Sequence, residues 1–344
     1  MIKKCSLNKA VFSSLLFLTI LVTGVSCNAS SADDAPVPEA TVQPTNIPTQ
    51  APNRVILVSP GDITPEELAE AQSFISQLAA GSNLVFETRE SISTNEITPD
   101  VKIAIFLEQP DNLGSLAASA PGTQFVAISD QDWNPPANGS IIRLKNDYVA
   151  FLSGYLSAMI APNFRAGALL VSEQTSFNQA YTNGVSYYCG ICAALVFPLN
   201  TYPIVTLQPA ASPPANWQAA FNEINQNKVN VLFLPREIVS AELGAFLATQ
   251  DVAIIGNGPP PVELSEKWVA TVKSDGMGAL QETWTDLVGG IGGKTINANI
   301  TFSDINYVSV TDGLVWLSQG KLQQLDELVQ LIRDDQIYPY DVIQ

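Results

Sequence analysis

Histidine is absent from this 344-residue chain, and basic residues are few. Without histidine the chain has no serine–histidine or cysteine–histidine pair for nucleophilic catalysis and no histidine ligand for a metal ion. Only 16 Lys and Arg residues stand against 33 Asp and Glu residues, which gives a formal net charge of −17. This charge argues against a nucleic-acid partner and against adsorption on an anionic membrane surface, because both require clustered positive charge.

Charged residues as a whole are also scarce, at 14% of the chain, whereas hydrophobic residues make up 46%. A disordered polyelectrolyte has the opposite composition, so we expect a globular protein with substantial hydrophobic cores. The length favours two domains of about 150 residues each.

The amino terminus has the layout of an export signal. Three lysines within the first nine residues precede an apolar run at residues 10–25, which is short for a membrane span of about 20 residues. The run ends in small residues before Cys27, and this resembles a bacterial lipoprotein signal in which the cysteine is lipidated. We therefore expect a signal peptide at residues 1–26 and a lipid on Cys27, on the extracytoplasmic face of a bacterial cell membrane. The alternative is ordinary cleavage near Ser26, which leaves Cys27 unmodified.

Residues 27–53 have a tether composition, with five prolines and no aromatic or basic residue between residues 28 and 53. Such a stretch cannot bury enough apolar surface to offset its ordering entropy, so we expect a disordered tether. The folded part is expected to begin near Arg54.

From Arg54 onward, short continuous apolar runs alternate with segments of helical periodicity, such as residues 146–160 and 322–333. This alternation is typical of parallel sheets covered by helices on both faces. The predicted fold class is α/β, with two doubly wound parallel-sheet lobes joined by a hinge. We assign residues 54–161 with about 270–305 to the first lobe, and 162–268 with about 312–344 to the second. A short hairpin is expected within residues 296–311.

Two motifs suggest chemistry. Residues 289–295, GGIGGKT, lack the first glycine of a phosphate loop, because that position is Val288, and they follow a helix; a helix end and turn is the better interpretation. Cys189 and Cys192 are three residues apart towards a helix end, which in an exported protein favours a structural disulfide. A reduced buried pair and a redox centre are the alternatives. We expect no metal and no cofactor.

The segment from Asp147 to Met159, DYVAFLSGYLSAM, resembles a helix of the basic membrane lipoprotein (purine nucleoside receptor-like) family, a branch of the type I periplasmic substrate-binding proteins. The segments at residues 180–184, 252–257 and 270–273 also have counterparts in that family. The chain departs from it at residues 59–62 and at Asn257, positions that hold the ribose or base in relatives. The resemblance implies a small polar solute, which could be a nucleoside, and an ABC permease as partner.

In a two-lobed receptor the ligand meets residues that follow strand ends. Phe177 would stack on a planar ligand, Asn178 and Asn257 would bond its polar edge, and Lys273, which matches a family lysine, would be the positive group. The alternatives are a core position for Phe177, a surface-loop anchor for Trp133, and a solvated charge for Lys273. The full candidate set is Asp62, Glu108, Asp130, Trp133, Glu173, Phe177, Asn178, Asn257 and Lys273.

The sequence thus favours a lipid-anchored solute-binding protein of an ABC-type importer, held to the membrane by its lipid only. A sensor or regulatory surface lipoprotein with a degenerate cleft and no transport role is the alternative. No motif supports an enzyme.

Overall fold

The computed structural model describes residues 51–59, 61, 63–192, 197–199, 202–307 and 315–340. The predicted signal peptide, Cys27, the tether up to residue 50, and the candidate Asp62 lie outside these residues. The chain divides into a unit at Met1–Thr49 and a second at Gln50–Gln344, and everything below concerns the second. Among the described residues, no helix has the length and apolar character that crossing a membrane requires.

Sheet A has six strands, all of them parallel, in the order β11-β5-β4-β3-β1-β2. The central strands are apolar runs that are buried on both faces, as the sequence pattern predicted. The strands are β1 (Arg54–Val58), β2 (Val85–Arg89), β3 (Val101–Phe106), β4 (Gln124–Ser129), β5 (Gly139–Arg143) and β11 (Lys294–Asn297).

Sheet B also has six strands, in the order β12-β10-β9-β8-β6-β7. Five of them are parallel, and β12 runs antiparallel to β10. The strands are β6 (Ala166–Val171), β7 (Ile204–Gln208), β8 (Val231–Leu234), β9 (Ala253–Gly256), β10 (Trp268–Asp275) and β12 (Asn299–Ser303).

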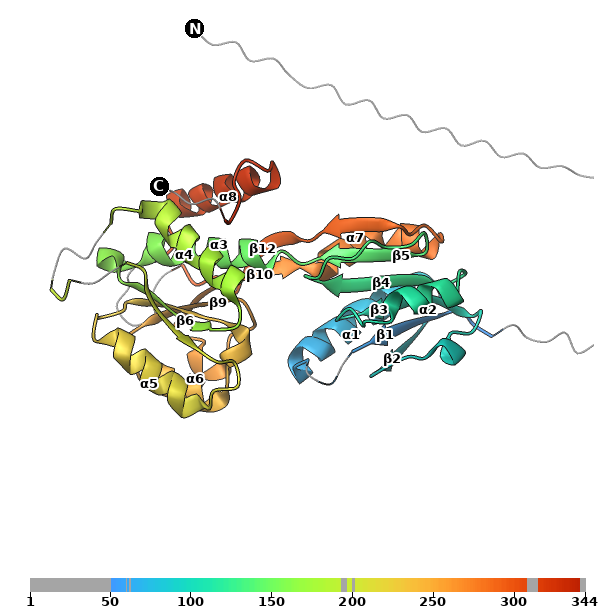
Figure 1. Cartoon of the computed structure of the whole chain (residues 1–344), viewed down its shortest axis with the longest axis horizontal. Coiled ribbons are helices and arrows are strands. Elements are labelled where there is room, and N and C mark those ends of the chain that lie inside the picture. The colour runs from blue at the N-terminus through green and yellow to red at the C-terminus, as the bar shows by residue number, and fades with distance from the viewer. Residues whose placement is uncertain are drawn as a thin grey trace, which may run out of the picture. The chain divides into compact units, whose positions relative to one another are not determined.

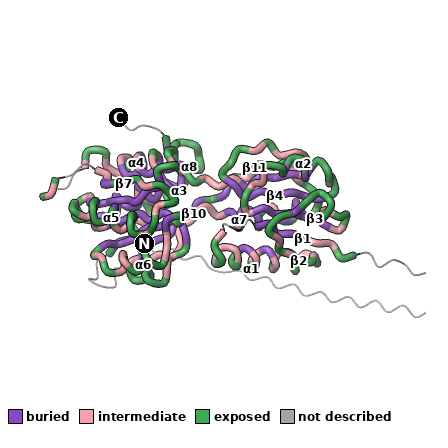
Figure 2. The backbone as a smooth tube through the Cα atoms, turned by 60° about the horizontal axis from the view of Figure 1, so that its bottom comes forward, coloured by how far each residue is buried: buried purple, intermediate pink, exposed green. Residues whose placement is uncertain are grey.

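Helices cover both faces of each sheet, so the predicted doubly wound α/β class is confirmed (Figure 1). Lobe A is sheet A with α1 (Pro65–Gly81) and α7 (Gly276–Val288) on one face and α2 (Leu113–Ser119) on the other. Lobe B is sheet B with α3 (Asn146–Ile160), α4 (Thr175–Cys189) and α8 (Gln319–Arg333) on one face, and α5 (Pro214–Asn225) and α6 (Ala241–Ala248) on the other. Figure 2 shows the buried residues concentrated along the strands. Short 3₁₀ turns lie at Thr94–Glu96, Pro162–Phe164, Arg236–Ile238 and Val262–Leu264.

Helices α3 and α4 approach each other at two glycines. A Cβ atom added to Gly154 would lie 2.1 Å from the carbonyl oxygen of Tyr181, and one added to Gly184 would lie 1.8 Å from that of Phe151. The two helices therefore touch through their backbones, and no larger residue fits at either position without moving them apart.

The predicted lobe boundaries differ from the structure in two places. Helix α3, expected in the first lobe, is buried along almost its whole length and packs between sheet B and α4. Strands β10 and β12, also expected in the first lobe, belong to sheet B. The predicted hairpin at residues 296–311 is wrong for the same reason, since β11 pairs in sheet A and β12 in sheet B.

The chain crosses between the lobes at three places within the described residues: after β5, after β10 and after β11. Hydrogen bonds join these segments to one another. The amide of Lys145 donates to Ser274 Oγ over 3.1 Å, and the amide of Ala298 donates to the carbonyl oxygen of Arg143 over 3.0 Å. These three adjacent crossings form the connection between the lobes.

Both local motifs have the predicted structure. Helix α7 ends at Val288, and the glycines after it form a turn in which Gly290 and Gly293 have positive φ angles of 78° and 73°. Cys189 and Cys192 form a disulfide at the end of α4.

Candidate functional site

The carboxyl ends of the parallel strands carry most of the predicted binding residues. Glu108 follows β3 and Asp130 follows β4 in lobe A, whereas Glu173 follows β6 and Asn257 follows β9 in lobe B. Lys273 lies near the end of β10, just before the chain crosses to lobe A. The expectation that ligand-binding residues follow strand ends, which we call the strand-end rule, therefore placed these five residues at the carboxyl edges of the two sheets.

Asn257 and Lys273 are brought together with a group of charged residues that the sequence did not single out. Asn257 Oδ1 accepts a hydrogen bond of 2.7 Å from the amide of Arg236, which follows β8. Arg236 Nη1 in turn donates to Glu67 Oε1 over 2.8 Å, and Lys273 Nζ lies 3.7 Å from Glu70 Oε1. Both glutamates belong to α1 of lobe A, so these two ion pairs join lobe B to lobe A.

The local sequence explains how these inter-lobe pairs arise. Thr64 caps α1 and its side chain exchanges hydrogen bonds with Glu67, which fixes that carboxylate in the first turn. On the other side, a Cβ atom added to Gly258 would lie 2.7 Å from Cβ of Arg236, so glycine is needed for Arg236 to sit there. Because capping already accounts for a glutamate in the first turn of α1, the sequence alone does not reveal that Glu67 also contacts lobe B.

Asp130 also contacts the opposite lobe. Its Oδ2 atom accepts a hydrogen bond of 3.0 Å from Nδ2 of Asn146, the first residue of α3. Glu108 is exposed, and its side chain forms no hydrogen bond or ion pair within the described residues. Glu108 therefore leaves a carboxylate available to a ligand at the edge of sheet A.

Glu173 is tied into its own loop. Its carboxylate accepts hydrogen bonds from Ser172 Oγ at 3.0 Å and from the amide of Ala210 at 3.2 Å. Its pKa lies below the ordinary value, first because of a hydrogen bond from its own backbone amide and then because of Ser172. Glu173 is therefore ionised at neutral pH and links the loops after β6 and β7.

Two side-chain amides of lobe B keep a free acceptor. Asn178 Nδ2 donates to the carbonyl oxygen of Val171 over 2.8 Å, and Gln174 Nε2 donates to Glu237 Oε1 over 3.4 Å. Because both partners are pure acceptors, the amide nitrogen of each side chain faces its partner. Both amide oxygens are buried and have no hydrogen-bond partner among the described residues. Such atoms could accept hydrogen bonds from a ligand. Gln174 was missed by sequence analysis, although it lies beside the candidate Glu173.

The two aromatic candidates do not offer a free ring to a ligand. Phe177 is 8% exposed and its ring stacks on that of Phe233, with centroids 6.0 Å apart, so it belongs to the core of lobe B. Trp133 is partly buried, and its ring covers Gly139 at the amino end of β5, the opposite edge of sheet A. The predicted stacking role of Phe177 is therefore wrong, because its helix turns that residue inward. The position of Trp133 likewise matches the alternative interpretation as a loop anchor.

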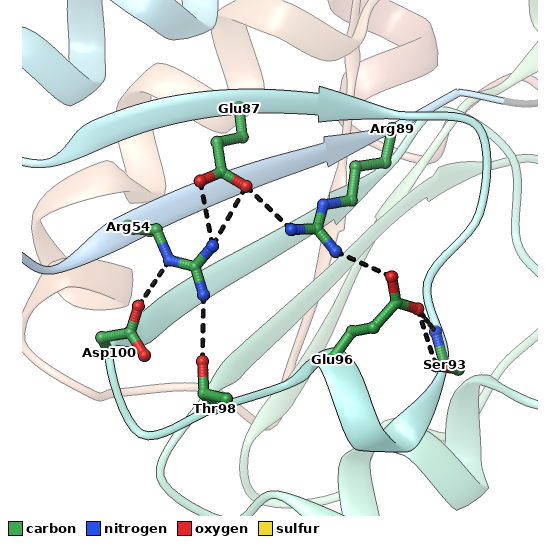
Figure 3. A network of polar contacts seen from close by, with 7 residues as sticks. All are labelled: Arg54, Glu87, Arg89, Ser93, Glu96, Thr98 and Asp100. Atoms are coloured by element: carbon green, nitrogen blue, oxygen red, sulfur yellow. Dashed lines mark hydrogen bonds and ion pairs between the residues drawn. The ribbon is translucent and has the colours of Figure 1, made fainter. Parts of the chain in front are cut away.

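A second polar network in lobe A serves a different purpose (Figure 3). Arg54, at the amino end of β1, donates to both carboxylate oxygens of Glu87 over 2.9 and 3.1 Å, to Thr98 over 2.9 Å and to Asp100. The hydrogen bond from Arg54 is the largest cause that lowers the pKa of Glu87. All of these residues belong to lobe A, so the network holds the β2–β3 connection on the sheet. No group of three or more Cys, Asp or Glu side chains among the described residues could hold a metal ion.

Comparison with known proteins agrees on the fold. No family model and no curated protein sequence matches the chain. Among solved structures, an ABC transporter solute-binding protein from Conexibacter woesei superposes with a TM-score of 0.61 at 14% identity, covering 83% of this chain and 98% of that protein. A solute-binding protein of the same description from Aeropyrum pernix gives 0.58 at 16% identity, covering 83% and 93%.

A regulatory protein is equally similar in structure. A transcriptional activator of the comK gene from Bacillus halodurans gives a TM-score of 0.63 at 10% identity, covering 83% of this chain and 100% of that one. The chain has the fold of the type I periplasmic binding proteins. Solute-binding proteins and regulators share this fold, so function has to be argued from the residues.

Proposed function

We propose that the chain is an extracytoplasmic solute-binding protein that captures a small polar solute between its lobes and delivers it to an ATP-driven importer. The observation that carries this proposal is the meeting of side chains from both lobes at the carboxyl ends of the strands, through Arg236 with Glu67 and Lys273 with Glu70. Parallel α/β sheets bind ligands outside the carboxyl ends of their strands. The three adjacent crossings would allow the lobes to move about them.

The polar groups at this edge support a solute rich in hydrogen-bond donors. Glu108 and the oxygens of Gln174 and Asn178 are acceptors, whereas Arg236 and Lys273 are already engaged with glutamates. A nucleoside, with its ribose hydroxyls, is one candidate, and the resemblance of residues 147–159 to the basic membrane lipoprotein family supports it. Phe177 is not available to stack on a base, so a sugar or an amine fits the residues as well.

We also propose that a lipid on Cys27 holds the protein on the outer face of the bacterial membrane, beside an ABC permease, and that the protein binds its solute without chemical turnover. The support is the signal-like sequence before Cys27 and the tether composition after it. Mass spectrometry of the mature protein tests the anchor, because an unmodified Cys27 would remove it.

A thermal-shift screen of residues 51–344 against nucleosides, sugars, amino acids and amines tests solute binding. A solute bound only by the native state at 100 times its Kd stabilises it by about 2.7 kcal/mol and raises the melting temperature. If no pool of solutes raises the melting temperature, the proposal is contradicted.

A sensor or regulatory surface protein without a transport role is the second candidate. The ion pairs that already fill part of the strand-end edge favour it, as does the altered sequence around Asn257. Genes for a permease and an ATPase next to this one would favour transport, whereas a neighbouring signalling gene would favour the sensor.

A further inference from the structure

The guanidinium of Arg236 lies between carboxylates from both lobes. Its Nη1 donates to Glu67 Oε1 of lobe A over 2.8 Å, and its Nε lies 3.9 Å from Glu237 Oε1 of lobe B. Glu237 also accepts a hydrogen bond of 3.4 Å from Nε2 of Gln174, which follows β6. Two carboxylates thus surround one cation at the carboxyl ends of the strands, and this leaves the group with one formal negative charge in excess.

The backbone of Arg236 is fixed, whereas its charged end is not. The Arg236 amide donates to Asn257 Oδ1 over 2.7 Å. The side chain, however, is 54% exposed, and those of Glu67 and Glu237 are 25% and 33% exposed. Exposed ion pairs contribute little to stability, so the guanidinium can leave these carboxylates at small cost. Glu67 is held by the cap of α1 and Glu237 by Gln174, so both carboxylates stay where they are.

The uncharged groups beside this position accept hydrogen bonds. Oε1 of Gln174 and Oδ1 of Asn178 are buried and have no partner among the described residues. A buried donor without a partner, Nε of Arg143, belongs to a guanidinium that is paired with Asp132 over 2.6 Å. Buried oxygens without a partner are complementary to a ligand that donates hydrogen bonds.

The cations at the carboxyl edges already have partners. They are Arg89 with Glu87 and Glu96, Arg143 with Asp132, Arg236 with Glu67, Lys273 with Glu70, and Lys145, whose Nζ lies 4.7 Å from the ring centroid of Tyr148. Glu108, in contrast, has a carboxylate without a partner within the described residues. The surplus of acceptors and negative charge favours a ligand that is itself positively charged.

We propose that Arg236 takes the place of a cationic solute in the solute-free protein. The solute is then a small organic amine or guanidine, whose charged group replaces the Arg236 guanidinium between Glu67 and Glu237. One charge-assisted contact between the lobes is exchanged for another, so the solute joins the lobes in turn. This inference rests on the proposed function, because it names the class of solute that the same edge would bind.

The exchange predicts the direction in which a variant of Arg236 changes affinity. If the solute has to displace the guanidinium from Glu67, only the fraction of molecules with that pair broken can bind, and removing the guanidinium raises the affinity. If Arg236 contacts the solute itself, removing it lowers the affinity. The sign of the change therefore distinguishes a side chain that competes with the solute from one that binds it.

Calorimetry with residues 51–344, which form a compact unit of their own, tests the class of solute. The probes are three pairs of similar size that differ in one or more positive charges: arginine with citrulline, putrescine with 1,4-butanediol, and glucosamine with glucose. We expect at least one cationic member to bind about tenfold or more tightly than its neutral partner. Its affinity should fall when the ionic strength rises from about 0.1 M to 1 M.

Two variants test the position of the charged group, with the cationic member that binds as the probe. Glu237→Gln should weaken binding about fivefold, because it keeps the shape of the side chain and removes its charge. Glu282→Gln, on the exposed side of α7, is its control. Arg236→Met should strengthen binding about threefold, and Arg333→Met is its control. Each control should stay within about twofold of the parent.

Three results would overturn the inference and leave the proposed solute binding in place. These are a neutral member that binds as tightly as its cationic partner, a loss of affinity in Arg236→Met, and no binding of any cation when another solute of the thermal-shift screen does bind. If no solute of that screen binds, the proposed function itself is contradicted.

Discussion

Two sets of ion pairs in this molecule use the same kinds of side chain for opposite purposes. In lobe A, Arg54 bonds three neighbours of its own lobe, and its side chain is 19% exposed. Between the lobes, Arg236 bonds Glu67 with 54% of its side chain exposed, and Lys273 lies near Glu70 with 41% exposed. Partly buried ions with several hydrogen bonds stabilise one arrangement, whereas exposed ion pairs contribute little and can break. The difference indicates rigid lobes with a weak contact between them.

The largest effect should come from the interior of a lobe. Gly184→Ala places a methyl group 1.8 Å from the carbonyl oxygen of Phe151, so α3 and α4 must separate. We expect the free energy of unfolding, measured by urea titration, to fall by about 3 kcal/mol or more.

Gly114→Ala in α2 is the matched control, because nothing lies within 4 Å of its added Cβ. It should be neutral or stabilising by up to about 1 kcal/mol. If Gly184→Ala lost as little stability as Gly114→Ala, the two helices would not be packed through their backbones.

Arg54→Met should have the next largest effect. We expect it to lower the free energy of unfolding by about 1–2 kcal/mol at pH 7, after allowance for the partial exposure of the side chain. The pKa of Glu87 is depressed mainly by Arg54, so the stability that this carboxylate contributes is present above its unfolded pKa and is lost as the pH falls through the folded pKa. The difference between parent and variant should therefore shrink below about pH 4.

Urea titrations at several pH values measure this difference, with Arg333→Met on the exposed end of α8 as a control expected within about 0.5 kcal/mol. A pH-independent difference would show that Arg54 acts through packing of its side chain rather than through its charge.

Arg236→Met should change stability by less than about 1 kcal/mol, because the pair with Glu67 is exposed. Its expected effect is on the distance between the lobes, measurable as a larger radius of gyration by small-angle scattering of the solute-free protein. The charge swap of Arg236→Glu with Glu67→Arg should restore the parent value. An unchanged radius in the single variant would mean that this pair does not hold the lobes.

Salt should produce the smallest effect and separate the two networks. Raising the ionic strength from about 0.1 M to 1 M shortens the screening length from about 10 Å to 3 Å. The radius of gyration of the parent should rise slightly, whereas the difference in unfolding free energy between the parent and Arg54→Met should stay nearly the same. A constant radius together with a loss of that free-energy difference would contradict the contrast between the two sets of contacts.

The strands, the covering helices and the disulfide could be predicted from the sequence because each follows from a local pattern. Helix α3, for example, has the expected limits, Asn146–Ile160. Which sheet receives α3 or β12 could not be predicted, because an apolar face shows that a segment is buried and does not name its partner. The strand-end rule placed Asn257 and Lys273 at the carboxyl edge of sheet B, and their role towards a ligand stays a prediction. It failed for Phe177, because the rule does not say which side of the following helix faces the core.

The most direct test of the account is the radius of gyration of residues 51–344 with and without a solute whose binding has been measured by calorimetry. Closure of two rigid lobes about the three crossings predicts a smaller radius when the solute is saturating. A solute that binds at the strand ends and leaves the radius unchanged would contradict the central claim that the lobes close on their ligand.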